Sequence, residues 1–271
     1  MRREHVRRNN DAVSVRTPAR SFSPFRISLT IRMHRVVPDF EMLAAAALLT
    51  AALVVGISSA SDYGISIDEF NADDYGPKAL AWYTSGFTDR AHFEQVEAPL
   101  WYYGPWFQIV VAYLQSFEFA DRFTVRHAAT FVLGWAGIAA ALPLGRLAFG
   151  KWAGVVAVLL CLITGYFYGS LFFTPIDVPF MATMTWAILS IVLMTRKVLP
   201  SWGASCASGL LIGLAMATRT GGIIALTYLA IALSFCAVEF ATLNGRVTLR
   251  YLAQIGGRSG AISLAGRCTA L

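Results

Sequence analysis

The feature that most constrains this sequence is a series of seven uncharged apolar runs, each close to the length of a membrane-spanning helix. Crossing the hydrocarbon core of a bilayer as a helix takes roughly 20 apolar residues. Only 14% of the chain is charged, whereas a soluble domain usually carries about 25%. The sequence therefore predicts an all-α integral membrane protein, folded as a multi-span helical bundle. The runs cover residues 42–61, 98–117, 127–145, 152–176, 178–195, 198–218 and 220–238.

The basic residues are distributed as in a membrane protein and not as in a nucleic-acid-binding protein. The formal net charge is +6, but the Lys and Arg side chains gather in an N-terminal stretch and at the ends of apolar runs. That distribution is typical of cytoplasmic flanks that face anionic lipid. We therefore expect membrane lipid and no nucleic acid as a partner. Residues 1–40 are expected to form a disordered basic cytoplasmic tail, 41–240 a membrane domain and 241–271 a second basic tail.

The aromatic segment 98–117 decides the topology. If it crossed the membrane, Arg146, Lys151 and Arg196 would all lie outside the cell, against the positive-inside rule. Its Trp and Tyr residues crowd one end, and a Gly-Pro pair there would break a spanning helix. We therefore expect a juxtamembrane helix on the outer surface, within an outer loop 62–126. Six spans follow, at 42–61, 127–147, 152–171, 178–195, 202–218 and 221–240, in a plasma or inner membrane with the N-terminus in the cytoplasm.

On this topology, ionisable residues from three parts of the chain reach the outer face. Asp68 and Glu69 follow the first span, Asp177 separates two long apolar runs, and Arg219 stands at an outer turn where cations are disfavoured. Ionisable groups at a membrane boundary are costly and mark functional sites by default.

Plainer roles remain open for each of these residues. Asp68 or Asp73 could cap a helix expected from about residue 72 to residue 84. Asp177 could likewise cap the fourth span, and Arg219 could extend to the lipid headgroups. His92, with Glu94 and Glu97, hints at a metal site, but solvated loop residues explain that pattern better, so we predict no metal site.

A set of short motifs follows in a fixed order and with consistent sidedness. They are Asp68-Glu69, Tyr75…Gly86, Pro99-Leu-Trp-Tyr-Tyr103, Val125-Arg126, Leu144-Gly-Arg146…Gly150, Asp177-Val-Pro179 and Gly213-Leu-Ala…Thr218-Arg219. This order resembles the C-type (GT-C fold) membrane glycosyltransferases that use polyprenyl-phosphate sugars, and most of all their protein O-mannosyltransferase and aminoarabinose transferase branch. Members of that family carry roughly twice as many spans, so the chain is expected to correspond to an N-terminal half.

The resemblance implies transfer of a sugar from a polyprenyl phosphate to an acceptor hydroxyl on the non-cytoplasmic face. Phosphate is a good leaving group, so the reaction needs a base for the acceptor and cations for the departing phosphate. By resemblance, Asp68 is the base of an inverting displacement and Glu69 its paired neighbour. Arg219 is the candidate for binding the lipid phosphate, with Arg126 second. Asp177 would position the acceptor, support the site electrostatically or bind a divalent ion.

The motifs leave the sugar and the acceptor open, and a protein, lipid or glycan hydroxyl would serve. No cofactor is specified, although a divalent cation is compatible with the acidic residues. Two other functions compete: a transporter with Asp177 and Arg219 as a coupling pair, and a non-catalytic membrane subunit. A transporter should place such groups near the middle of the bilayer. Here they gather at one face, which favours the glycosyltransferase.

Overall fold

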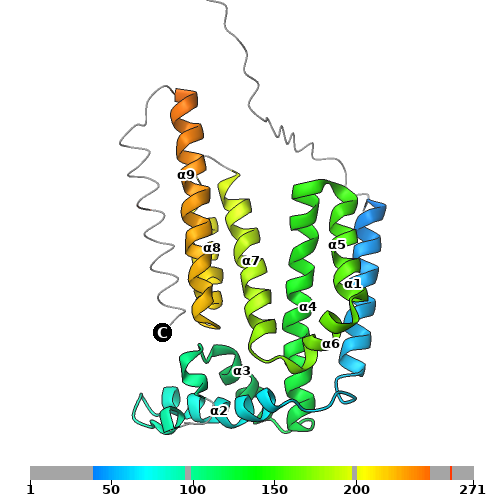
Figure 1. Cartoon of the computed structure of the whole chain (residues 1–271), viewed down its shortest axis with the longest axis vertical. Coiled ribbons are helices and arrows are strands. Elements are labelled where there is room, and N and C mark those ends of the chain that lie inside the picture. The colour runs from blue at the N-terminus through cyan, green and yellow to red at the C-terminus, as the bar shows by residue number, and fades with distance from the viewer. Residues whose placement is uncertain (1–38, 95–98, 197–199, 245–256, 258–271) are drawn as a thin grey trace, which may run out of the picture. The chain divides into compact units, whose positions relative to one another are not determined.

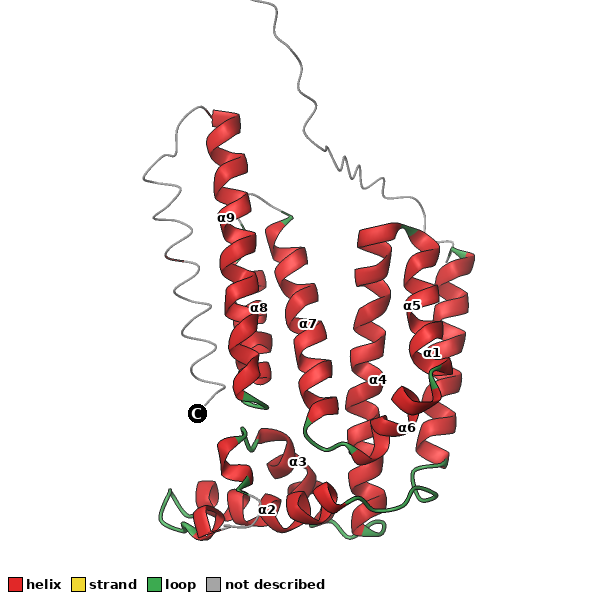
Figure 2. Ribbon diagram, viewed as in Figure 1, coloured by secondary structure: helices red, strands yellow, loops and turns green. Residues whose placement is uncertain are grey.

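A computed structural model describes residues 39–94, 99–196 and 200–244, together with residue 257. Within these residues the secondary structure is entirely helical, as Figures 1 and 2 show. The predicted all-α bundle is thereby confirmed. The predicted tails fall almost wholly outside the described residues.

Long apolar helices make up the bundle and lie side by side (Figure 1). Within the described part of the chain, four helical segments are long and apolar enough to cross a membrane. The last of them begins in a 3-10 turn, η3 (Thr220–Ile223), that leads into the final helix. All four match predicted spans to within a few residues. They are α1 (Phe40–Ser58), α4 (Arg122–Phe149), α7 (Asp177–Thr195) and η3 with α9 (Ile224–Asn244).

Two predicted spans differ from a straight spanning helix. The span expected at 152–171 is split into α5 (Lys151–Ile163) and α6 (Gly165–Phe173), which are bent by 70° at Thr164. The bend arises because Thr164 adopts an extended conformation, and the crossing expected at 152–171 stays a prediction. The helix expected at 202–218 is α8 (Trp202–Met216), whose 15 residues fall short of the roughly 20 needed to cross. The count of six spans therefore stays a prediction.

Helix α4 packs against α7 on one side and against α1, α5 and α6 on the other. Its Gly134 and Gly137 face the start of α7, and a Cβ added at Gly137 would lie 2.8 Å from the Cα of Ala182. Small residues of this kind let membrane helices approach closely. Gly209 and Gly213 are likewise buried, in α8. On its other side α4 shares an apolar core with α1, α5 and α6, centred on Phe131, Phe172 and Leu171.

A layer of short helices lies across one end of the bundle, at the bottom of Figures 1 and 2. It consists of α2 (Ile67–Thr84), η1 (Ala91–Glu94), η2 (Leu100–Tyr102) and α3 (Trp106–Gln115). Segment 98–117, predicted not to span, contains no helix longer than the 10 residues of α3. Arg146, in the last turn of α4, and Arg196, which ends α7, lie at the opposite end of the bundle. Which of the two ends faces the cytoplasm stays a prediction.

Candidate active site

Helix α2 begins at a capping box formed by Ser66 and Glu69. The backbone N–H of Ser66 donates to Glu69 Oε2 at 2.8 Å, and Ser66 itself has an extended backbone. The helix therefore starts at Ile67, before the expected start near residue 72, and neither Asp68 nor Asp73 is its N-cap. A Ser followed three residues later by Glu is a recognisable signal for a helix start, and it was available in the sequence.

A cavity of about 370 Å³ lies where α2, the η2 segment, the start of α7 and the turn after α8 meet. Asp68 lines it from the first turn of α2, Asp177 from the start of α7 and Arg219 from the turn after α8. Three of the predicted site residues, far apart in sequence, thus share one cavity. The other lining residues are Asn71, Pro99, Leu100, Tyr102, Tyr103, Thr174, Pro175 and Ile176.

Arg219 is held between a carboxylate and an aromatic ring. Its Nη1 donates to Asp177 Oδ1, and its guanidinium carbon lies 5.7 Å from the centroid of the Tyr103 ring. A cation over an aromatic face is a stabilising arrangement. Asp177 is the first residue of α7, and its side chain forms the ion pair with Arg219. Both side chains stay accessible, 41% exposed for Arg219 and 60% for Asp177.

The aromatic segment is docked directly onto the end of α8. A Cβ added at Gly104 would lie 1.4 Å from the carbonyl oxygen of Ala217, so only glycine fits at this approach. Two residues later, Trp106 Nε1 donates to Thr218 Oγ1 at 2.6 Å. These contacts place Tyr103 beside Arg219, which follows Thr218 in the chain.

Glu69, predicted to pair with Asp68 in catalysis, does not line the cavity. Its side chain is fully buried, and its Oε1 lies 2.8 Å from His127 Nε2 on α4. The other ring nitrogen of His127 lies 2.9 Å from the carbonyl oxygen of Ala60. The two adjacent carboxylates therefore have separate surroundings, one in the cavity and one between α2 and α4.

Arg126, the second candidate for the lipid phosphate, is also outside the cavity. It is fully buried and donates to Gln108 Oε1 at 2.6 Å and to Asp73 Oδ1 at 3.4 Å. Asp73 also pairs with Arg122 at 2.5 Å and accepts a hydrogen bond from Gln115. This network fastens α2 and α3 to the start of α4.

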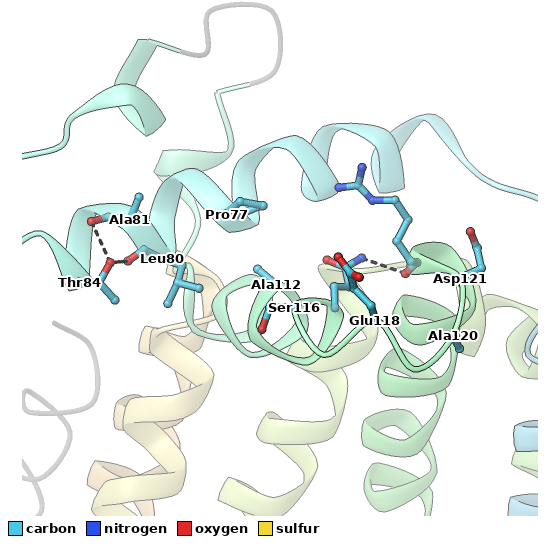
Figure 3. A pocket seen from close by; sticks show the side chains of 11 residues that line it. Pro77, Leu80, Ala81, Thr84, Ala112, Ser116, Glu118, Ala120 and Asp121 are labelled. Atoms are coloured by element: carbon cyan, nitrogen blue, oxygen red, sulfur yellow. Dashed lines mark hydrogen bonds between the residues drawn. The ribbon is translucent and has the colours of Figure 1, made fainter.

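A larger cavity, of about 700 Å³, lies between α2, α3 and the start of α4 (Figure 3). Its wall includes Thr84, whose hydroxyl donates to backbone carbonyls of its own helix, and Gln115, which donates to the Arg122 carbonyl. None of the predicted site residues lines it. The full lining is Pro77, Leu80, Ala81, Thr84, Ala112, Gln115, Ser116, Glu118, Ala120, Asp121 and Arg122.

Burial shifts the pKa values of Tyr75, Tyr83 and His92 in the layer of short helices. Burial raises the pKa of Tyr75 to about 12, so its hydroxyl stays neutral. Burial lowers the pKa of His92, whose ring packs among aromatic side chains. His92 therefore belongs to a packed cluster and is not a solvated loop residue. No metal-like group of three His, Cys, Asp or Glu occurs in the part of the chain described; Glu97 falls outside that part.

The sequence reasoning missed His127 and Gln108. Both are polar residues inside otherwise apolar runs, and both bind a charged residue that the reasoning did single out. Polar groups in membrane segments are rare and usually paired, so their position was a usable signal. Their partners, however, come from a distant part of the chain.

The chain was then compared with known proteins. A family model described as dolichyl-phosphate-mannose-protein mannosyltransferase matches residues 101–252. The match includes Asp177 and Arg219 and begins after Asp68. No curated protein and no solved structure matches the chain. Because the family model covers more than half of the chain, the resemblance is confirmed: the chain belongs to the dolichyl-phosphate-mannose-protein mannosyltransferase family, multi-pass membrane glycosyltransferases that use polyprenyl-phosphate sugar donors.

Proposed function

We propose that this chain carries the catalytic cavity of a glycosyltransferase, which moves a sugar from a polyprenyl phosphate to an acceptor hydroxyl on the non-cytoplasmic face. The supporting observation is that Asp68, Asp177 and Arg219, from three distant parts of the chain, line one cavity of about 370 Å³. The elements that line the cavity, among them α2 and the start of α7, lie at one end of the bundle of apolar helices (Figure 1), where the headgroup of a membrane-held donor would be. A transporter would place such groups within the bundle.

Asp68 is the proposed general base. Its carboxylate takes the proton of the acceptor hydroxyl as that oxygen attacks the anomeric carbon. The bond between this carbon and the phosphate oxygen breaks in the same step, the phosphate leaves with the electron pair, and the configuration is inverted. Asp68 lies in the first turn of α2 and lines the cavity.

Arg219 is the proposed ligand of the donor phosphate. A guanidinium can donate to two phosphate oxygens at once and offset the charge that develops as the phosphate leaves. The contacts with Asp177 and Tyr103 hold this guanidinium at the cavity wall while leaving it accessible. The proposed role of Asp177 is to orient Arg219 and so to support the site electrostatically, the second of the three roles suggested for it by the resemblance.

Asp68→Asn tests the proposal most directly. The amide keeps the shape of the side chain but cannot accept the proton, so we expect sugar transfer to fall by about 10² to 10⁴. Donor binding should be retained, because Arg219 is untouched. The assay is transfer from dolichyl-phosphate mannose to acceptor in proteoliposomes, with binding of the donor measured separately.

Asp74→Asn is the matched control. Asp74 lies on the same helix, and its carboxylate pairs with Lys78 at 2.6 Å on the exposed surface. Losing an exposed pair of this kind changes stability by a few tenths of a kcal/mol, so transfer should be unaffected. Transfer at the wild-type rate by the Asp68→Asn protein would rule out Asp68 as the base.

A further inference from the structure

The carboxylate next to the proposed base lies in a fully buried contact with a histidine. Glu69 Oε1 is 2.8 Å from His127 Nε2, and Glu69 Oε2 accepts the Ser66 N–H. His127 Nδ1 is 2.9 Å from the carbonyl oxygen of Ala60. Both side chains are at most 2% exposed. The imidazole is thus placed between two oxygen atoms.

These contacts require a proton between Glu69 and His127. A backbone carbonyl oxygen only accepts hydrogen bonds, so Nδ1 of His127 must carry a hydrogen. Nε2 then either donates to the carboxylate, as in an imidazolium, or accepts from a protonated carboxyl. Without that proton, two lone pairs would face each other in a buried site, which is strongly unfavourable. Glu69 is fully buried and does not line the cavity, so its carboxylate is not in a position to meet an acceptor hydroxyl there.

The same contacts fix the first turn of α2. The pair with His127 attaches this turn to α4, and Ser66 Oγ donates to the Phe173 carbonyl at 3.0 Å, which attaches it to the end of α6. The residues that follow Phe173, from Thr174 to Asp177, line the cavity. These contacts therefore fix the position of the turn that carries Asp68 relative to the cavity wall formed by Thr174 to Asp177.

We propose that Glu69 and His127 are positioning residues, which direct Asp68 into the cavity through their buried contact and through the hydrogen bond that Glu69 accepts from the Ser66 N–H, and which take no part in proton transfer from the acceptor. The inference rests on the proposed role of Asp68. It differs from the catalytic role that the Asp-Glu pair suggested for Glu69. It also assigns a role to His127, which the sequence reasoning did not single out.

A comparison of two substitutions of Glu69 distinguishes a positioning role from a direct role in proton transfer. In Glu69→Gln, the amide nitrogen can donate to a neutral His127 while the amide oxygen still accepts the Ser66 N–H. Glu69→Ala leaves both partners unpaired. Since a misplacement of about 1 Å can lower a rate about 10²-fold, Glu69→Ala should reduce kcat by that order with the donor KM unchanged. Glu69→Gln should recover most of the lost rate.

Substitutions of His127 give an independent pair. The amide of Gln reaches the place of Nε2 and keeps the contact with Glu69, whereas the amide of Asn reaches the place of Nδ1 and keeps only the contact with Ala60. Positioning through Glu69 therefore predicts that His127→Gln is more active than His127→Asn. Equal activity of the two would contradict it.

A thiol at position 68 reports the geometry without any transfer assay. The labelling rate of Asp68→Cys with a membrane-impermeant maleimide should change when Glu69→Ala is added and stay the same with Glu69→Gln. Asp74→Cys is the control and should label equally in all backgrounds. The labelling rate does not depend on whether Asp68 is the base. It therefore tests the positioning role of Glu69 separately from the proposed function.

Two results would overturn the inference. One is a Glu69→Gln protein as inactive as Glu69→Ala with normal labelling at position 68, which would give the carboxylate a direct chemical role. The other is labelling at position 68 that is indifferent to every change at Glu69. If Glu69→Ala does not accumulate in the membrane, the comparison of His127→Gln with His127→Asn decides between the two roles.

Discussion

Gly104→Ala is predicted to disrupt the cavity although Gly104 does not line it. The added Cβ would lie 1.4 Å from the Ala217 carbonyl oxygen and 2.0 Å from its carbon, while real Cβ contacts essentially never fall below 3.0 Å. The aromatic segment must therefore move away from α8. That movement breaks the 2.6 Å hydrogen bond between Trp106 and Thr218 and withdraws Tyr103 from Arg219. Overpacking of this kind costs about 1–3 kcal/mol, and the lost hydrogen bond about 1 kcal/mol more.

The expected result is a lower thermal midpoint together with slower sugar transfer and a higher donor KM, because the guanidinium that binds the phosphate loses its aromatic support. Thermal unfolding in detergent and transfer from dolichyl-phosphate mannose in proteoliposomes measure the two effects. Gly64→Ala is the control, since a Cβ there meets no atom within 4 Å. Wild-type kinetics and an unchanged midpoint for Gly104→Ala would refute the view that this contact holds the site together.

Two further predictions concern charge. Asp177→Asn removes the carboxylate that orients Arg219. An exposed pair contributes about 0.2–1 kcal/mol, so the donor KM should rise by up to about fivefold, and a fall would show instead that the carboxylate competes with the phosphate for Arg219. Burial lowers the pKa of His92, so the unfolded chain, with a pKa near 6.5, binds the proton more readily. Stability should therefore be complete above about pH 6.5 and decline as the pH falls, a dependence that tryptophan fluorescence should detect and His92→Phe should lack.

The sequence could predict the long helices and their ends because the bilayer sets both. An uncharged run of fixed length becomes a spanning helix, and Lys and Arg mark one side, which was enough to bring Asp68, Asp177 and Arg219 to one end of the bundle. The break at Thr164 was not predictable in this way, since it lies inside an uncharged run and leaves the composition unchanged.

The sequence pattern also could not predict the direction in which each side chain points. Neighbouring residues on a helix point about 100° apart, so Asp68 and Glu69 cannot both face the cavity once α2 starts at Ile67. Arg126 was identified correctly as a notable cation, but its partners Asp73 and Gln108 come from other helices. Only the three-dimensional arrangement shows that its guanidinium is already engaged by Asp73 and Gln108.

The length of α4 sets the depth, relative to the lipid, of the layer formed by α2, η1, η2 and α3. Arg126 and Arg146 are separated by 20 residues of this helix, a rise of about 30 Å, which equals the thickness of a typical hydrocarbon core. The turn that precedes Arg126 and anchors α2 would thus stand at the headgroups. A bilayer of different thickness would shift that turn against the donor's phosphate, so the rate of sugar transfer should vary with the acyl-chain length of the host membrane.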